Sequence, residues 1–139
     1  MIILDTDCFT LAQRSSSTEG RKLAERILGE KSDEIGVTII TFEEQMRRWL
    51  TYVAKSTKEE SRILAYGRLV EMLSDFAKVR VLAYDQEASF HYQRLAKAKL
   101  RIGTMDLKIG AIALANSATL VTRNSAISLA DRYLMSSLS

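Results

Sequence analysis

The sequence predicts an α/β fold: a single domain with a central parallel sheet of four or five strands, flanked by helices on both faces. Three observations predict it. Short aliphatic or β-branched runs alternate with longer segments in which apolar residues recur every three or four positions. The runs are mostly apolar, as expected of strands buried on both faces. The length of 139 residues suits one domain, and no proline, linker or low-complexity tract divides it.

The first half of the chain is predicted to contain two strands and three helices. Ile2 to Leu4 and Ile35 to Ile40 are the strand-like runs, and a helix opens at Ser17-Thr18-Glu19 and reaches about Leu28. Further helices are predicted from Thr41 and over Lys58 to Phe76, each with an apolar stripe typical of packing on a core. These stripes contain Phe42, Met46, Trp49, Leu50 and Val53, and then Ile63, Tyr66, Leu69, Val70 and Leu73.

The second half continues the alternation of strands and helices. Val79 to Leu82 and Thr119 to Thr122 read as strands, and Asp85 to Leu100 and Thr104 to Asn116 as helices. The segment 125–139 has an apolar scatter consistent with a closing helix whose serine-rich end frays. Strands separated by helices indicate crossover connections, and hence a parallel sheet.

The composition excludes several classes of protein. No apolar run is long enough to cross a bilayer, and the N-terminus lacks the basic and long apolar regions of a signal peptide, so we expect a cytoplasmic location. Cys8 is the only cysteine, which excludes an internal disulfide and a cysteine-rich zinc site, and we expect a buried, inert thiol. A lone histidine, His91, cannot form a histidine-rich metal centre.

The formal net charge is +3, and much of the excess lies in one stretch ahead of Asp106. Such a stretch is compatible with a phosphate-rich partner. It is equally the pattern of a solvated helix face, and the binding interpretation requires that these residues flank a functional site. They are Arg94, Lys97, Lys99 and Arg101.

Three carboxylates, Asp5, Glu44 and Asp106, come just after apolar runs or in the first turn of a predicted helix. Ligands of open α/β sheets bind at the carboxyl ends of the strands, so we expect these side chains to form one acidic pocket. Two carboxylates about 4 Å apart repel by roughly 4 kcal/mol at an effective dielectric near 20. Such a pocket therefore needs protons or a cation, and oxygen ligands favour Mg²⁺ or Mn²⁺.

Each carboxylate also has a purely structural interpretation. Asp5 or Asp7 can cap a short helix that follows the first strand. Thr41 and Glu44 have the spacing of a capping box, in which Glu44 bonds back to the Thr41 amide. Asp106 can be a solvated acid in the first turn of a helix, where the helix dipole favours it.

The segment around Asp106 has a further property. Thr104 can cap the helix, and the face that carries Asp106 continues through small and apolar residues. A carboxylate on such a face needs a partner, because burial of an isolated charge is unfavourable. The residues that follow on this face are Ile109, Gly110 and Ala113.

Four motifs, taken in order, resemble the PIN-domain family, specifically its VapC-like toxin branch. The match runs from Ile2 through Asn124, and within it Asp5, Glu44 and Asp106 correspond to the acids of the family. The motifs are Ile3-Leu4-Asp5-Thr6-Asp7, Thr38-Ile39-Ile40-Thr41-Phe42-Glu43-Glu44, Arg101-Ile102-Gly103-Thr104-Met105-Asp106 and Ala118-Thr119-Leu120-Val121-Thr122-Arg123-Asn124.

The resemblance implies a Mg²⁺- or Mn²⁺-dependent endoribonuclease, usually a homodimer, that is held inactive by a cognate antitoxin encoded beside it. Asp5 and Asp106 would bind the metal, with Glu44 direct or through water as the third catalytic acid. The expected supporting residues are Thr6, Thr104 and Asn124, and the expected RNA-binding residues are Arg94, Lys97, Lys99 and Arg101.

The chain departs from the family pattern near its end, where the usual fourth acid is absent and Ser125-Ala126-Ile127-Ser128 stands instead. Asn124 or Asp131 would have to substitute for it. We therefore expect one nuclease-like domain, residues 1–139, with an atypical segment 125–139. The alternative is a binding module of the same fold, for antitoxin or RNA, with weakened or lost catalysis.

The first of these motifs also resembles a motif of a different enzyme class. Asp5-Thr6-Asp7 resembles the opening motif of haloacid-dehalogenase-type phosphatases. That motif requires Thr or Val at its fifth position, where this chain has Phe9, and Thr10 comes one residue late.

Overall fold

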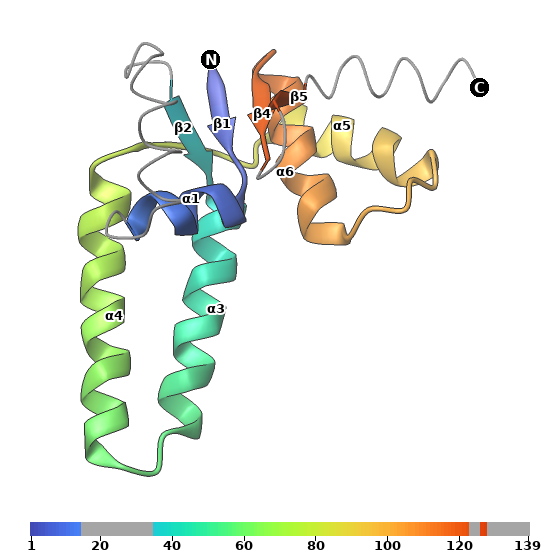
Figure 1. Ribbon diagram of the computed structural model, residues 1–139. Helices are drawn as coiled ribbons and strands as arrows, with labels where there is room; N and C mark the ends of the chain where they lie inside the picture. The colour runs from blue at the N-terminus through green and yellow to red at the C-terminus, as the bar shows by residue number, and fades with distance from the viewer. Residues whose placement is uncertain (15–34, 123–125, 128–139) are drawn as a thin grey trace.

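The computed structural model describes residues 1–14, 35–122 and 126–127 (Figure 1). The helix expected near 17–28, most of the segment 125–139, and Asn124 lie outside the described residues. The elements, in chain order, are β1 (Ile2–Leu4), α1 (Thr6–Gln13), β2 (Ile35–Thr38), α3 (Ile39–Lys55), α4 (Glu59–Ala77), β3 (Arg80–Leu82), α5 (Gln86–Lys97), α6 (Thr104–Ala115), β4 (Thr119–Val121) and β5 (Ala126–Ile127).

The sheet has the order β3-β2-β1-β4-β5. The first four strands are parallel, and the short β5 pairs antiparallel with β4. The predicted α/β class and parallel sheet are confirmed. Chain order runs from β1 outward to β3 on one side and returns to β4 on the other, so strand order reverses between β1 and β4. Asp5 directly follows β1 and lies at this switch point, where open α/β sheets bind ligands.

Helices cover both faces of the sheet, as predicted (Figure 1). Successive strand residues point to opposite faces. Ile3 and Leu120 pack in a core cluster with residues of α6, whereas Leu4 and Val37 pack with α1 and α4. The expectation for the thiol is confirmed, because Cys8 belongs to the second cluster and is 0% exposed.

Two helix starts and one helix cap differ from the sequence-based expectation. A helix, α1, begins immediately after β1, where a short helix was considered only in the capping interpretation of Asp5 or Asp7. α3 begins at Ile39, because the Thr38 side chain accepts the Thr41 amide at 3.3 Å and caps the helix two residues before the expected start. The predicted capping box of Thr41 and Glu44 is therefore wrong. Gly103, rather than Thr104, occupies the N-cap of α6.

α3 and α4 run antiparallel and project together away from the sheet (Figure 1). The buried residues of α4 are Ala65, Met72 and Phe76, with Leu69 half-buried. The predicted burial of the rest of its apolar stripe is wrong, because α3 covers only the adjacent face of the helix. The exposed members of the stripe are Ile63, Tyr66, Val70 and Leu73, all more than half exposed.

Among the described residues, no helix combines the length and apolar character needed to cross a membrane.

Candidate functional site

Asp5 joins the end of β1 to the start of α1. Its backbone N–H donates to the Val121 carbonyl at 3.1 Å, and its Oδ1 accepts the Cys8 amide at 2.8 Å. The capping interpretation of Asp5 is thus realised in the structure. It does not exclude a functional one, because Oδ2 accepts no hydrogen bond from the described residues.

Thr6 links the start of α1 to Glu44 in the second turn of α3. Its hydroxyl donates to Glu44 Oε1 at 2.8 Å and lies 3.0 Å from the Thr41 hydroxyl. A hydroxyl has one hydrogen, so the Thr41 hydroxyl must donate to Thr6. This chain of bonds from Thr41 through Thr6 fixes the direction of the Glu44 carboxylate. The predicted supporting residue Thr6 is therefore in contact with a predicted acid.

The carboxylates of this region repel one another. Burial raises the pKa of Glu44 above its ordinary value, and repulsion by Asp106 and Asp7 raises it further. The Thr6 hydrogen bond and the charge of Arg48 lower the pKa of Glu44. The effect of Asp106 on the pKa of Glu44 is consistent with the predicted acidic pocket, in which these two acids lie near each other.

Asp106 lies in the first turn of α6 and is exposed overall. Shielding of its carboxylate from water nevertheless raises its pKa, and repulsion by Asp5 and then Asp7 adds to the effect. Its helix face continues into Ile109 and Ala113, which are buried as predicted. We refer to Asp5, Asp7, Glu44 and Asp106 as the acidic cluster.

Two members of this neighbourhood were missed by sequence reasoning. Asp7 was considered as a cap and as part of a phosphatase-like motif, but not as a member of the metal site, although it repels both Glu44 and Asp106. Arg48 was not considered, although it is the cation that acts on Glu44. A signal was present in each case: Asp7 stands two residues after Asp5, and Arg48 follows Glu44 by four residues, one helical turn.

The donor chemistry of the acidic cluster fits a hard divalent cation, because carboxylate and hydroxyl oxygens gather where negative charge is in excess. The arrangement of these possible metal ligands is less complete. Among residues 1–14, 35–122 and 126–127, no three His, Cys, Asp or Glu side chains are arranged as ligands of one ion. The cluster is therefore a site at which a cation would relieve repulsion.

The other residues predicted for the site are not members of the acidic cluster. Thr104 is exposed at the first residue of α6, and Asn124 is outside the described residues. The four basic residues are exposed on the last turn of α5 and in the connection that leads to Asp106. None of them is among the charges that perturb the pKa of Asp106. They border the segment that carries Asp106 in sequence, but they do not neutralise it.

Comparisons with known proteins agree with this architecture. The family model described as PIN domain matches residues 2–133. No curated protein sequence matches the chain significantly. Among solved structures, FitAcB from Neisseria gonorrhoeae is 22% identical, with a TM-score of 0.63, over 89% of this chain and 88% of that chain.

Two further structures share the fold. VapBC2 from Rickettsia felis, bound to a DNA fragment from its promoter, is 25% identical over 89% of this chain and 88% of that chain, with a TM-score of 0.59. VapC20 from Mycobacterium tuberculosis, a toxin that cleaves the sarcin-ricin loop, is 11% identical over 85% of each chain, with a TM-score of 0.51.

Proposed function

Because this chain belongs to the PIN-domain family, we propose that it is a Mg²⁺- or Mn²⁺-dependent endoribonuclease, the toxin of a toxin–antitoxin pair. The observation that carries the proposal is the acidic cluster. Acids from β1–α1, α3 and α6 repel one another at the switch point of the sheet. The solved structure that is named as a cleaving toxin supports the choice of RNA as substrate.

In this proposal, Asp5 and Asp106 hold the metal ion, and Glu44 contacts it directly or through water. When bound, the ion polarises the scissile phosphate and lowers the pKa of an attacking water. Glu44 Oε1 is held by Thr6, which leaves Oε2 as the atom that can accept a proton from that water. The raised pKa of Glu44 makes its carboxylate a stronger base than that of a solvent-exposed glutamate.

The proposed partners follow from the same family. The similar structures FitAcB and VapBC2 support a cognate antitoxin protein and, by extension, a homodimer. Arg94, Lys97, Lys99 and Arg101 are proposed to hold the RNA backbone, which would make binding sensitive to salt. A cytoplasmic location and a single nuclease domain over 1–139, with Thr104 and Asn124 in supporting roles, complete the proposal.

Metal-dependent cleavage tests the proposal. The purified chain, freed of any partner, is incubated with structured RNA in Mg²⁺, in Mn²⁺ or in chelator. We expect cutting only with the metal ions, and loss of cutting in Asp5→Asn and in Asp106→Asn. Glu87→Gln is a matched control, because Glu87 is exposed on α5. Undiminished cutting by both site variants would remove the assigned site.

A second candidate function is a binding module of the same fold. It is favoured by the acidic cluster, which lacks a ready three-ligand arrangement among the described residues, and by the missing fourth acid. This candidate predicts no cutting by the native chain with any divalent ion, together with retained binding of antitoxin or RNA.

A further inference from the structure

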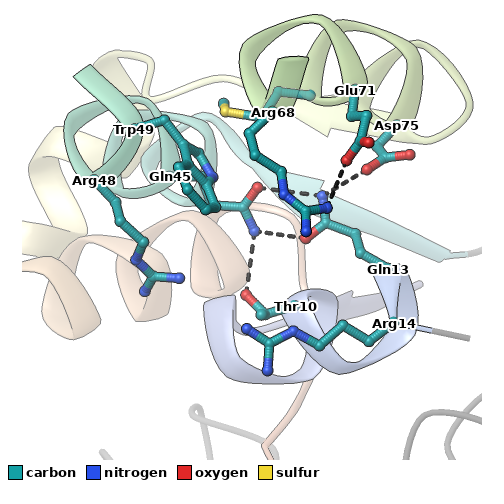
Figure 2. A pocket seen from close by; sticks show the side chains of 10 residues that line it. Thr10, Gln13, Arg14, Gln45, Arg48, Trp49, Arg68, Glu71 and Asp75 are labelled. Atoms are coloured by element: carbon teal, nitrogen blue, oxygen red, sulfur yellow. Dashed lines mark hydrogen bonds and ion pairs between the residues drawn. The ribbon is translucent and has the colours of Figure 1, made fainter. Parts of the chain in front are cut away.

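A polar pocket of about 370 Å³ lies between α1, α3 and α4 (Figure 2). None of the four residues of the acidic cluster lines it. It is nevertheless adjacent to them, because its lining residues Gln45 and Arg48 follow Glu44 on α3 by one and four residues. Arg48 connects the two places, because it lines the pocket and its charge lowers the pKa of Glu44.

Two glutamines close one side of the pocket by bonding to each other. Gln45, which is 3% exposed, donates from Nε2 to Gln13 Oε1 at 2.8 Å and to Thr10 Oγ1 at 3.2 Å. Gln13 donates from Nε2 to Gln45 Oε1 at 3.2 Å and to Asp75 Oδ2 at 3.0 Å. All four amide hydrogens are thus engaged. This side of the pocket, shown in Figure 2, offers acceptors and no donors to a ligand.

The lining also carries cationic and aromatic groups. The Arg68 guanidinium is paired with Glu71 Oε2 at 2.8 Å and lies 5.9 Å from the centre of the Trp49 ring. Arg48 makes no hydrogen bond or ion pair with the described residues, and its side chain extends from α3 beside the pocket (Figure 2). With Arg14, the lining contains three arginines and two acids, Glu71 and Asp75. Arg48 is the group of this lining that can bind an anion.

These features match the chemistry of one unpaired nucleotide. Single-stranded RNA is recognised by bases that stack on aromatic or guanidinium planes and form hydrogen bonds at their edges, while basic residues bind phosphate. The volume falls within the range of small-ligand pockets. A basic side chain of a protein partner would find the same acceptors, but it would have to approach the arginines.

We propose that the pocket is a subsite for one unpaired nucleotide beside the scissile phosphate, in which Arg48 binds phosphate and Asp75 and Gln13 accept hydrogen bonds from the base. The proposal rests on the proposed function for the identity of the substrate. Adenine, cytosine and guanine each carry an exocyclic amino group with two N–H donors, which could bond to both Gln13 and Asp75, whereas uracil has a single ring N–H. The subsite therefore favours an amino-bearing base over uracil.

Binding of short RNA tests the Arg48 contact without catalysis. The full chain carrying Asp106→Asn is titrated with fluorescein-labelled 12-nucleotide oligo(A), oligo(C) and oligo(U) at several salt concentrations. Adding Arg48→Ala is expected to reduce the slope of log affinity against log salt by about 0.7, the value for one lost phosphate contact on a single strand. Arg47→Ala is the matched control, because Arg47 pairs with Glu43 at 2.7 Å and does not line the pocket.

The base contact is tested in the same assay by Asp75→Asn, which we expect to reduce the preference for oligo(A) and oligo(C) over oligo(U). Glu60→Gln, exposed on α4 outside the pocket, is its control. Circular dichroism verifies that each variant is folded. Arg48→Lys keeps the positive charge, so it is expected to retain the salt slope that Arg48→Ala loses.

The outcomes separate this proposal from the function on which it rests. If the native chain cuts RNA with Mn²⁺, and Arg48→Ala and Asp75→Asn variants of it bind and cut with unchanged base preference, the subsite is overturned and the nuclease stands. If the native chain cuts no RNA but Arg48→Ala reduces the salt slope, the subsite stands and the nuclease fails. Loss of antitoxin binding in these variants, with RNA binding unchanged, would also overturn the subsite.

Discussion

At the level of single residues, Thr6 connects α1 to the Glu44 carboxylate on α3. Its hydroxyl accepts from Thr41 and donates to Glu44, so one side chain on α1 sets the direction of an acid on α3. Sequence rules assigned Glu44 to a local capping box with Thr41, because the spacing fits. The actual bond joins residues 38 positions apart, and no local pattern encodes a contact of that kind.

Replacement of Thr6 by the isosteric Val tests this role. The Thr41 hydroxyl and Glu44 Oε1 would each lose a partner, so we expect the free energy of unfolding to fall by about 1–3 kcal/mol. The pKa of Glu44 should rise further, because the Thr6 bond lowers it in the native chain. Urea denaturation measures the first effect, and NMR of the Glu44 carboxyl carbon measures the second. Thr51→Val, exposed on α3, is the control and should change neither.

The raised pKa values predict how stability depends on pH in chelator. Between their ordinary values, 4.5 for Glu44 and 3.8 for Asp106, and the raised values of the fold, the folded chain holds protons that the unfolded chain has released. Stability from these groups therefore falls as pH rises through that window. Melting temperatures measured over this range should decline less in Asp106→Asn than in the native chain. An identical decline would show that the acids do not repel.

At the level of elements, the sequence predicted most strands and helices but misplaced the boundary between β2 and α3. Ile39 and Ile40 were assigned to a strand because they are β-branched, yet both belong to α3. Tertiary contacts override the strand preference of these two residues. β2 ends at Thr38, whose side chain is fully buried and accepts a hydrogen bond from the Thr41 amide. Similarly, α1 was considered only as one of two interpretations of Asp5, and the structure shows that Asp5 is its cap.

The true cap of α3 can be verified by Thr38→Ala. Loss of the side-chain acceptor should destabilise the protein by about 1 kcal/mol, with a range of about 0.5–2 for such caps. It should also speed hydrogen exchange at the Thr41 amide, which this cap protects. Thr38→Ser, which keeps the hydroxyl, should restore much of the protection. Unchanged exchange at Thr41 in Thr38→Ala would contradict the assigned cap.

At the level of the whole molecule, the hairpin of α3 and α4 shows what periodicity predicts and what it does not. The stripe of α4 was correctly identified as one helix face, but its outer part is exposed. Periodicity states which residues share a face, and a neighbouring element must exist for that face to be buried. The acidic cluster illustrates the same point. Strand ends predicted that its acids would meet, whereas the pocket depends on how three helices pack, which no motif encodes.

Substitutions on the two faces of α4 should therefore differ in effect. Val70→Glu places a charge where the native side chain is 66% exposed, and stability should stay within about 0.5 kcal/mol. Met72→Ala removes a side chain that is 3% exposed and should reduce the free energy of unfolding by about 2–5 kcal/mol. Urea titration of both variants measures the difference. Equal losses would show that Val70 is covered in the folded chain.

The buried thiol of Cys8 has a practical consequence for all of these measurements. It is the only sulfhydryl in the chain, and at 0% exposure it is inaccessible to alkylating reagents while α1 rests on the sheet. The rate at which Cys8 is alkylated therefore reports how often α1 separates from the sheet. Asp5 caps α1, and Gln13 on α1 lines the pocket. A divalent ion bound to Asp5, or a nucleotide bound in the pocket, would slow alkylation of Cys8. The native chain therefore contains a residue that reports whether these sites are occupied.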